Sequence, residues 1–250
     1  MEIITSQDNK KIKNIVKLKQ KKYRDEQARY LVEGYKNVLD SVAARSDLVD
    51  FVILSESAYN SVGEKFTGVP CVVAADHVFD KISDTQNSQG VACVNKIVKP
   101  DGLPKAERCV YLDRIRDPGN VGTILRSAVA SGYDVVLDNC ADMYSPKVVR
   151  SAMSAVVKCR AYEGVSISEL KKSGYEIVVA DMNGDSVFTA EHSDKYCVVI
   201  GNEAEGVSSE ISAAADRLLC IPQENIESLN AGVAAGIMMF ALRYVKTCRD

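Results

Sequence analysis

Polar side chains gather in a short loop near the end of the chain, between a strand-like run and an apolar helix. The run from Arg217 to Ile221 stops at Pro222, and the loop leads into a helix that we expect to begin at Ser228. Such a loop exposes backbone amides and polar side chains at the edge of a packed core, as small-molecule sites require. An ordinary strand-to-helix connection, with Ser228 as the helix N-cap, is the alternative that the loop alone leaves open.

Two more polar, glycine-bearing loops follow apolar strand-like runs. One comes after Leu112 and the other after Ile200. Because ligands of open α/β sheets bind beyond the carboxyl ends of the strands, the three loops define one candidate site. No Gly-x-Gly-x-x-Gly follows the strand ending at Leu112, and no Gly-x-x-x-x-Gly-Lys-Ser/Thr occurs anywhere. The sequence therefore predicts a ligand that is bound in some other way.

The first part of the chain alternates short apolar runs with helical segments. We expect strands over residues 30–33, 51–54, 71–74 and 91–94, and helices over 6–24, 34–44, 56–66 and 76–82. This alternation predicts a small α/β sandwich. Residues 96–107 contain two prolines and a glycine, which is the composition of an interdomain linker.

A second α/β series follows this linker. We expect strands over 109–112, 135–137, 177–180, 196–200 and 217–221. Helices are expected from the turn at 117–120 to about 131, over 146–153, and in the final segment. Because the strands are apolar throughout, they predict a parallel sheet covered by helices on both faces.

The eight cysteines and two histidines give little support to a metal site. No two cysteines form a Cys-x-x-Cys pair, and most lie in apolar strand-like runs. Buried free thiols explain them better than disulfides or zinc ligation. With only His77 and His192 available, a histidine-rich metal site is not expected either.

The net charge of −3 is spread unevenly along the chain. Residues 10–24 carry eight lysines and arginines and no acidic residue. A solvated amphipathic helix with Ile12, Ile15, Val16 and Leu18 on its inner face is one interpretation. We favour contact with a polyanion, because so dense a run concentrates positive potential.

Composition and hydropathy favour a cytoplasmic protein. Hydrophobic residues make up 46% and charged residues 26% of the chain, as in ordinary soluble domains. No uninterrupted apolar run reaches the roughly 18 residues of a membrane span. Residues 1–7 have no basic region followed by an apolar one, so no signal peptide is expected.

Taken together, the three loops resemble the SpoU–TrmH family of RNA 2′-O-ribose methyltransferases, within the SPOUT class. The segments that carry the resemblance are Leu112-Asp113-Arg114-Ile115-Arg116-Asp117-Pro118-Gly119-Asn120-Val121-Gly122-Thr123-Ile124-Leu125-Arg126-Ser127-Ala128, Val199-Ile200-Gly201-Asn202-Glu203-Ala204-Glu205-Gly206-Val207, and Ile221-Pro222 with Glu227-Ser228-Leu229-Asn230. They stand in the family's order and, with the alanine- and glycine-rich helix that follows, span residues 112 to about 242.

The first part of the chain is similar to the family's L30e-like substrate-binding domain, through the segments 30–34 and 89–92. The third loop departs from the family pattern in two places. The family usually has Met where this chain has Gln223, and commonly has Gly near Asn225.

The resemblance implies an N-terminal L30e-like α/β sandwich over residues 1–98 and a methyltransferase domain over residues 107–250. The second domain would be a parallel sheet with a C-terminal trefoil knot, formed where the last strand, loop and helix thread through an earlier loop. It would bind S-adenosylmethionine in the knot, and the protein would be a homodimer with the site near the subunit interface.

Methylation of a ribose 2′-OH requires a positioned electrophile and an oxygen freed of its proton. The family assigns activation of the hydroxyl to the position of Arg126. A guanidinium stays protonated, so we expect Arg126 to stabilise the developing alkoxide and to clamp a phosphate that accepts the proton. An isolated helix would favour a surface salt bridge instead.

Four other residues complete the expected catalytic set, each with a structural alternative. Asn120 can cap its helix or position Arg126 or the substrate, and Glu203 can orient Arg126, hold its loop or simply face solvent. Ser228 and Asn230 can cap and brace the last helix. The resemblance implies that these two also meet the substrate or cofactor.

The expected cofactor contacts are Ala180, Gly201, Ile221 and Leu229, which act through backbone groups and apolar surface around adenine. Gly232 and Gly236 form a small face on the last helix. It allows close packing within the core or against a partner subunit.

The predicted function is methyl transfer from S-adenosylmethionine to a ribose 2′-OH of RNA, with ribosomal RNA favoured by the L30e-like domain and the basic segment. Transfer RNA is the alternative substrate. A non-catalytic RNA-binding or ribosome-assembly protein of the same fold, and an ordinary nucleotide-dependent oxidoreductase, are the alternatives from other classes.

Overall fold

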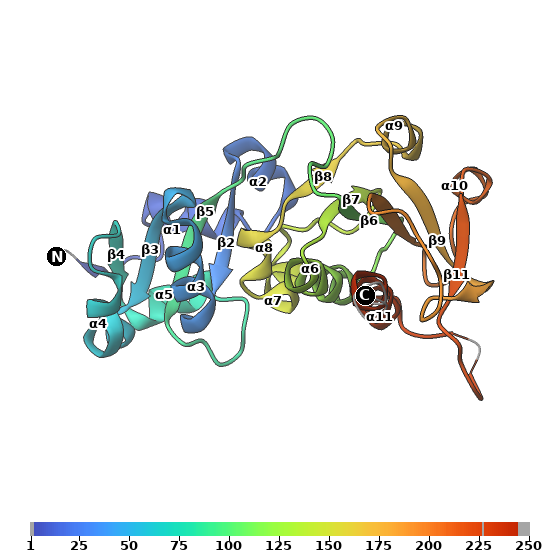
Figure 1. Cartoon of the computed structure of the whole chain (residues 1–250). Coiled ribbons are helices and arrows are strands. Elements are labelled where there is room, and N and C mark those ends of the chain that lie inside the picture. The colour runs from blue at the N-terminus through green and yellow to red at the C-terminus, as the bar shows by residue number, and fades with distance from the viewer. Residues whose placement is uncertain (1–2, 227, 245–250) are drawn as a thin grey trace. The chain divides into compact units, whose positions relative to one another are not determined.

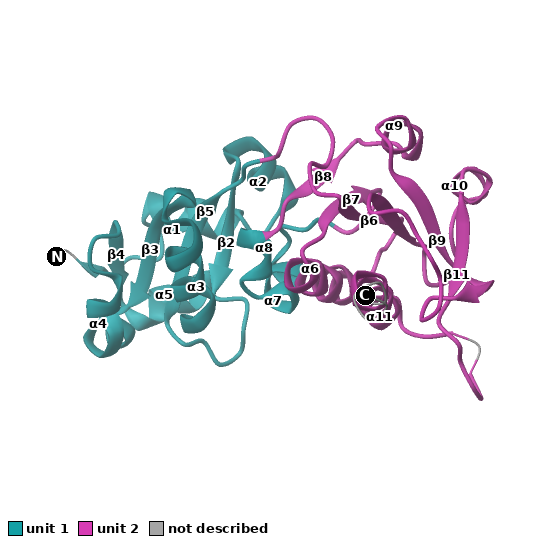
Figure 2. Ribbon diagram, in the orientation of Figure 1, with its two compact units in different colours: residues 1–98, 142–158 teal, residues 99–141, 159–250 magenta. Residues whose placement is uncertain are grey.

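The chain forms two compact units, which the computed structural model describes for residues 3–226 and 228–244. One unit comprises residues 1–98 and 142–158, and the other comprises residues 99–141 and 159–250 (Figure 2). Residues 142–158 belong to the first unit by their contacts, although they follow the predicted linker in the sequence.

The first unit contains a five-stranded mixed sheet in the order β1-β4-β3-β5-β2 (Figure 1). Its strands are β1 (Ile3–Ile4), β2 (Arg29–Glu33), β3 (Val49–Ser55), β4 (Cys71–Ala74) and β5 (Val91–Lys96). Its helices are α1 (Lys10–Lys17), α2 (Lys21–Gln27), α3 (Tyr35–Arg45), α4 (Glu56–Val62), α5 (Asp76–Ile82), α7 (Pro146–Ala152) and α8 (Ala155–Lys158), with 3-10 turns at Ser46–Leu48 and Gly63–Phe66. The predicted α/β sandwich is confirmed, with strand β1 and helix α8 as additions.

The single helix predicted over residues 6–24 is wrong, because two short helices occupy this segment. Asn9 caps α1 by accepting from the Lys11 N–H at 2.8 Å. The guanidinium of Arg24 is buried and donates to the carbonyls of Leu18 and Lys19 at 2.8 and 2.9 Å. These carbonyls lie at the end of α1, where a helix leaves its last acceptors unpaired. Arg24 therefore stabilises the break between the helices instead of extending one helix.

The second unit contains a six-stranded parallel sheet in the order β11-β9-β10-β6-β7-β8. Its strands are β6 (Arg108–Asp113), β7 (Asp134–Asp138), β8 (Ala161–Glu163), β9 (Glu176–Ser186), β10 (Tyr196–Ile200) and β11 (Arg217–Cys220). Its helices are α6 (Pro118–Ser131), α9 (Ile167–Lys172), α10 (Ser209–Ala213) and α11 (Ala231–Tyr244). The parallel sheet is confirmed, whereas β8, α9 and α10 were not predicted.

Helix α11 returns from the edge of this sheet toward its middle. The chain leaves β11 at the edge, and α11 then packs against α6 and β10 (Figure 1). Tyr133 and the buried His192 hold the second half of α11 by donating to the carbonyls of Met239 and Leu242, at 2.9 and 2.8 Å. The second half of α11 is therefore held against the core of this unit.

Candidate active site

Side chains from all three predicted loops are joined by hydrogen bonds. Asn120, in the first turn of α6, donates from Nδ2 to Oε1 of Glu203 at 2.6 Å. Asn230, immediately before α11, donates from Nδ2 to Oδ1 of Asn120 at 2.8 Å. We call Glu203, Asn120 and Asn230 the amide network. Three of the five residues predicted to be catalytic therefore lie in direct contact.

The start of α11 fixes the direction of this network. Oδ1 of Asn230 accepts from the N–H groups of Gly232 and Val233 at 3.0 and 3.2 Å. Its amide nitrogen is therefore the group left for Asn120, whose own nitrogen must then face Glu203. The network runs as a series of donors that ends on a carboxylate, and Glu203 keeps further acceptor capacity for a ligand.

Two capping predictions are wrong. Helix α6 is capped by Asp117, whose Oδ1 accepts from the Asn120 N–H at 2.9 Å, and Pro118 occupies its first turn. Helix α11 begins at Ala231 and is capped by Asn230, so Ser228 is not its cap. Because Asp117 performs the capping of α6, the buried side chain of Asn120 is available to the amide network.

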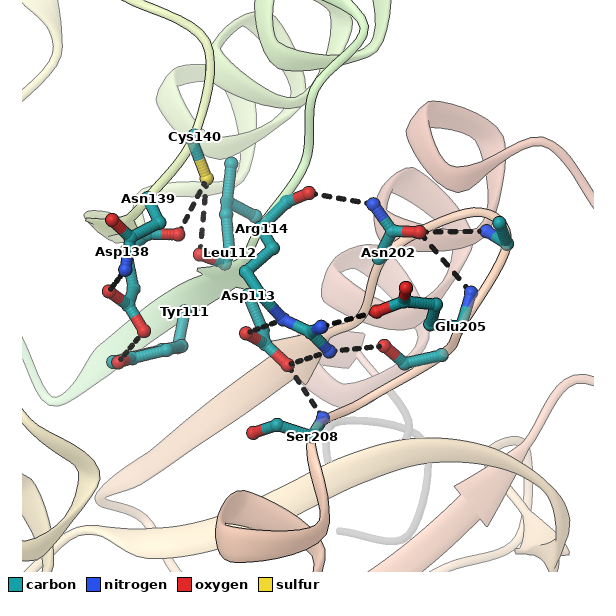
Figure 3. Close-up of polar contacts among 12 residues, drawn as sticks. Tyr111, Leu112, Asp113, Arg114, Asp138, Asn139, Cys140, Asn202, Glu205 and Ser208 are labelled. Carbon is teal, nitrogen blue, oxygen red and sulfur yellow. Dashed lines mark hydrogen bonds and ion pairs between the residues drawn. The ribbon is translucent and has the colours of Figure 1, made fainter.

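A second set of contacts, which was not predicted from the sequence, joins the loops after β6 and β10 (Figure 3). Nε of Arg114 donates to the buried carboxylate of Asp113 at 2.9 Å, and its Nη1 donates to Glu205 at 2.5 Å. The other oxygen of Asp113 accepts from the Ser208 N–H at 2.7 Å. The hydrogen bond to Asp113 raises the pKa of Arg114 above its ordinary value. We call Asp113, Arg114 and Glu205 the charged clamp. Arg114 and Glu205 have opposite charges and lie in two loops that were predicted to be neighbours, so the sequence contained the information needed to predict this ion pair.

The loop after β10 is folded tightly on itself. Oδ1 of Asn202 accepts from the N–H groups of Ala204 and Glu205, and its Nδ2 donates to the Arg114 carbonyl at 2.8 Å. A Cβ atom on Gly201 would lie 2.3 Å from the Val207 nitrogen, a distance that only glycine avoids. The geometry gives Gly201 this packing role, and its predicted contact with the cofactor stays a prediction.

A cavity of about 140 Å³ is lined by two residues that directly precede Asn230 in the chain and by most of the predicted cofactor contacts. Ala180, Ile221 and Leu229 line it, together with Ser228 from the predicted catalytic set. Its other lining residues are Asp181, Met182, Leu219, Cys220, Gln223, Ala234 and Met238. Most of these walls are aliphatic or sulfur-bearing, so the cavity suits a flat apolar group better than a charged one.

In the loop between β11 and α11, Asn225 has a left-handed backbone conformation. Asn225 has φ = 64°, a conformation that glycine adopts freely and asparagine tolerates better than most other residues. The asparagine that stands near the family's usual glycine therefore supports the same kind of turn. This departure from the pattern has a conformational explanation.

Arg126 is not hydrogen-bonded to the amide network among the described residues. Val121, Ile124, Leu125 and Ala128 form the predicted buried stripe of α6, and Arg126 is on its exposed side. Across residues 3–226 and 228–244 the Arg126 guanidinium forms no hydrogen bond or ion pair, so neither Glu203 nor Asn120 orients it. Its charge is available to a ligand.

Metal and thiol chemistry find no support in the described residues. No group of three His, Cys, Asp or Glu side chains there could hold a metal ion. The seven described cysteines are free, and Cys248 lies outside the described residues. Burial raises the pKa of the Cys140 thiol to about 11 and that of Cys159 to about 12, so both stay protonated near neutral pH.

Among the described helices, none has the length and apolar character needed to cross a membrane.

Comparison with known proteins identifies the family of this chain. The SpoU rRNA Methylase family model matches residues 107–240, and the MRM3-like substrate binding domain matches residues 9–93. The chain is 30% identical to the 23S rRNA (guanosine(2553)-2′-O)-methyltransferase RlmP of Bacillus subtilis, over 97% of this chain and all of the relative.

Solved structures give the same result. The AdoMet-bound rRNA methyltransferase from Sinorhizobium meliloti has a TM-score of 0.83 and 30% identity, with 97% of each chain covered. The SpoU methyltransferase AviRb from Streptomyces viridochromogenes, solved in complex with AdoMet, shares the fold with a TM-score of 0.81, 22% identity, and 96% and 98% of the two chains covered.

The chain belongs to the SpoU rRNA methylase family, of the SPOUT class. It is an S-adenosylmethionine-dependent RNA ribose 2′-O-methyltransferase with an N-terminal substrate-binding domain. The predicted family, fold class, activity and cofactor are thereby confirmed.

Proposed function

We propose that the amide network forms the reaction site for a 2′-hydroxyl of ribosomal RNA, and that the adjoining cavity holds S-adenosylmethionine. The observation that carries this proposal is the hydrogen-bonded series from Glu203 through Asn120 to Asn230. Leu229, next to Asn230 in the chain, lines the cavity, so one loop serves both parts of the site.

S-adenosylmethionine supplies an activated methyl group when it is bound. Ala180, Ile221 and Leu229 would hold it through apolar surface and backbone groups, and Ser228 would contribute a hydroxyl at the cavity wall. The apolar lining fits the adenine part of this cofactor, because a purine has two flat faces and no charge.

The protein must hold the 2′-hydroxyl and favour the loss of its proton. Asn120 and Asn230 fix the carboxylate of Glu203, which can then accept a hydrogen bond from the ribose. Arg126 would bind an RNA phosphate and stabilise the developing alkoxide, as its unpaired, exposed guanidinium permits. That phosphate, and not Arg126, would accept the proton, because a guanidinium stays protonated.

Part of the basic segment supports the contact with RNA. Arg24 is buried in an ion pair with Asp142, and Lys19 donates to the carbonyls of Lys81 and Ser83, so both have structural roles. The remaining six lysines, Lys10, Lys11, Lys13, Lys17, Lys21 and Lys22, lie on the two short helices α1 and α2. We assign them to the phosphate backbone, which sequence-independent contacts recognise.

Ribosomal RNA is favoured over transfer RNA because RlmP, similar over its whole length, is named for 23S rRNA. The enzyme would then act in the cytoplasm. The non-catalytic alternative is disfavoured because the matching family model and the named relatives are rRNA methyltransferases.

The homodimer expected from the resemblance has support in α11. Val233, Phe240 and Tyr244 are 48%, 39% and 48% exposed. Their spacing of seven and four residues places them on one face of the helix. An exposed apolar face of this kind is suited to a second subunit. Light scattering after size exclusion tests it: a monomer at micromolar concentration would contradict the dimer.

The central experiment is methyl transfer in vitro with labelled cofactor and purified ribosomal or transfer RNA. We expect transfer to a 2′-hydroxyl of ribosomal RNA, and a loss of about 100- to 1,000-fold in Arg126→Ala with cofactor affinity largely unchanged. Mapping of 2′-O-methyl sites in cells with and without the gene identifies the nucleotide. Strong residual transfer by Arg126→Ala would remove Arg126 from the mechanism, and preference for transfer RNA would replace the proposed substrate.

A further inference from the structure

Gln223 leaves a buried acceptor unpaired at the wall of the cavity. Its side chain lines the cavity, yet its Oε1 atom is inaccessible to solvent and has no hydrogen-bond partner within the described residues. A buried carbonyl without a donor is unfavourable, and such atoms are rare in folded proteins. An unpaired acceptor at a ligand cavity indicates that the ligand supplies the donor.

The cavity accommodates only part of a cofactor. Its volume of about 140 Å³ is below the roughly 300–1,000 Å³ of complete small-molecule sites. Met182, Leu219, Ile221, Leu229 and Met238 are the larger apolar residues that line it. Asp181 is the acidic residue of the lining, but most of the lining residues are apolar, so a neutral purine fits the cavity better than the charged methionine end of S-adenosylmethionine.

The edge of adenine complements a carboxamide. Its exocyclic amino group is a donor that stands beside a ring nitrogen acceptor, and glutamine side chains recognise this pair with two hydrogen bonds. The carbonyl of Gln223 can therefore accept from the amino group while its amide nitrogen donates to the ring. No other base edge of the cofactor competes, because adenine is its only base.

We propose that Gln223 recognises the adenine of S-adenosylmethionine by accepting a hydrogen bond from the exocyclic amino group. This inference rests on the proposed function, because it requires that the cofactor occupy this cavity. The hydrogen bond also explains why glutamine can stand where the family usually has methionine. A methionine offers only apolar contact, whereas Gln223 adds selectivity for a purine with a 6-amino group.

The test is a calorimetric cycle with two ligands and matched variants. The ligands are S-adenosylhomocysteine and its analogue with hydrogen in place of the 6-amino group, which keeps every ring nitrogen. The protein variants are Gln223→Met, which installs the family's usual residue, and Gln223→Leu. Glu224→Ala is the control, because Glu224 is exposed and does not line the cavity.

We expect the wild-type protein and Glu224→Ala to bind the amino ligand about three- to tenfold more tightly than the analogue, as one net hydrogen bond allows. Both Gln223 variants should lose this preference. If they keep the preference, or lose affinity for both ligands equally, Gln223 does not read the amino group and the inference is overturned.

Ala180→Trp distinguishes two hypotheses: that Gln223 binds the amino group, and that the cofactor occupies this cavity at all. The indole should fill the cavity and abolish binding of both ligands while the thermal transition persists. If Ala180→Trp binds S-adenosylhomocysteine like the wild type, the cofactor lies elsewhere, and the proposed cavity falls together with the role of Gln223. If only the Gln223 cycle fails, the cavity stands and the inference alone falls.

Discussion

The amide network and the charged clamp both join the loops after β6 and β10, and the amide network also includes Asn230 from the loop after β11, but they differ in chemistry. In the clamp, the buried Asp113 is satisfied by Arg114 and the Ser208 N–H, so its acceptors are used within the protein. In the network, neutral amides lead to Glu203, which is exposed and keeps acceptor capacity. A set of contacts that closes on itself positions a loop, whereas one that ends on an open acceptor can receive a ligand.

Substitution of Glu203 tests the open end of the network and should have the largest effect. Glu203→Gln can still accept from Asn120 but carries no charge, and Glu203→Ala removes both. We expect each to lower methyl transfer by about 100-fold, with cofactor affinity within threefold of the wild type. Single-turnover rates and calorimetry measure the two. Full activity in Glu203→Gln would mean that the hydrogen bond, and not the charge, is what the reaction uses.

Asp113→Asn tests the structural role of the charged clamp. The variant loses the charge beside Arg114 and one of the two acceptors, so the free energy of unfolding should fall by about 1–3 kcal/mol. Transfer per folded molecule should change by less than about threefold. Denaturation in urea gives the first quantity. An intact stability with a large catalytic loss would assign the clamp to the reaction and erase the contrast with the amide network.

Asn230→Asp separates the two roles of Asn230. Aspartate caps a helix as well as asparagine does, so the stability of α11 should be preserved. Its carboxylate cannot donate to Oδ1 of Asn120, and the direction of the network is lost. We expect transfer to fall by about tenfold with an unchanged melting temperature. A melting temperature that falls in step with activity would show that Asn230 acts only as a cap.

Gly232→Ala and Gly236→Ala form a matched pair beside the network, with the smallest expected effect. A Cβ on Gly232 would lie 3.1 Å from the Thr123 side chain, whereas one on Gly236 would lie 3.4 Å from Ser127 Oγ, an ordinary contact. We expect Gly232→Ala to lose about 1 kcal/mol through crowding. Gly236→Ala should be neutral or gain up to about 1 kcal/mol from helix propensity. Equal stabilities would show that α6 and α11 adjust freely.

The sequence allowed the loops to be predicted better than the contacts between them. The apolar runs at residues 71–74 and 196–200 are strands with the predicted bounds, because short runs rich in valine favour buried strands over helices or loops. The strands β1 and β8 have two and three residues, too few for a periodic signal. Arg24 ended a helix through contacts that no local pattern encodes.

At the site, types of residue were predictable and partners were not. Asn120, Glu203 and Asn230 are identified by resemblance, and Asn230 caps α11 as one of the predicted alternatives, whereas α6 is capped by Asp117 and not by Asn120. The positive φ of Asn225 could not be predicted from the sequence, because asparagine adopts both positive and negative φ values. Orientation of Arg126 by Glu203 or Asn120 is one of the predicted alternatives, but neither residue forms a hydrogen bond with it among the described residues, because the rotation of α6 places Arg126 on the exposed side of the helix.

The hydrogen bond between Asn120 and Asn230 also has a consequence for how the protein folds. It joins residues 110 positions apart, and the contact with Glu203 spans 83 positions. Contacts between distant parts of a chain form late and slowly. The amide network can therefore assemble only when α11 has docked beside α6. The cofactor binds only the state in which α11 is docked and therefore stabilises that state. Bound cofactor should therefore slow the undocking of α11 from α6.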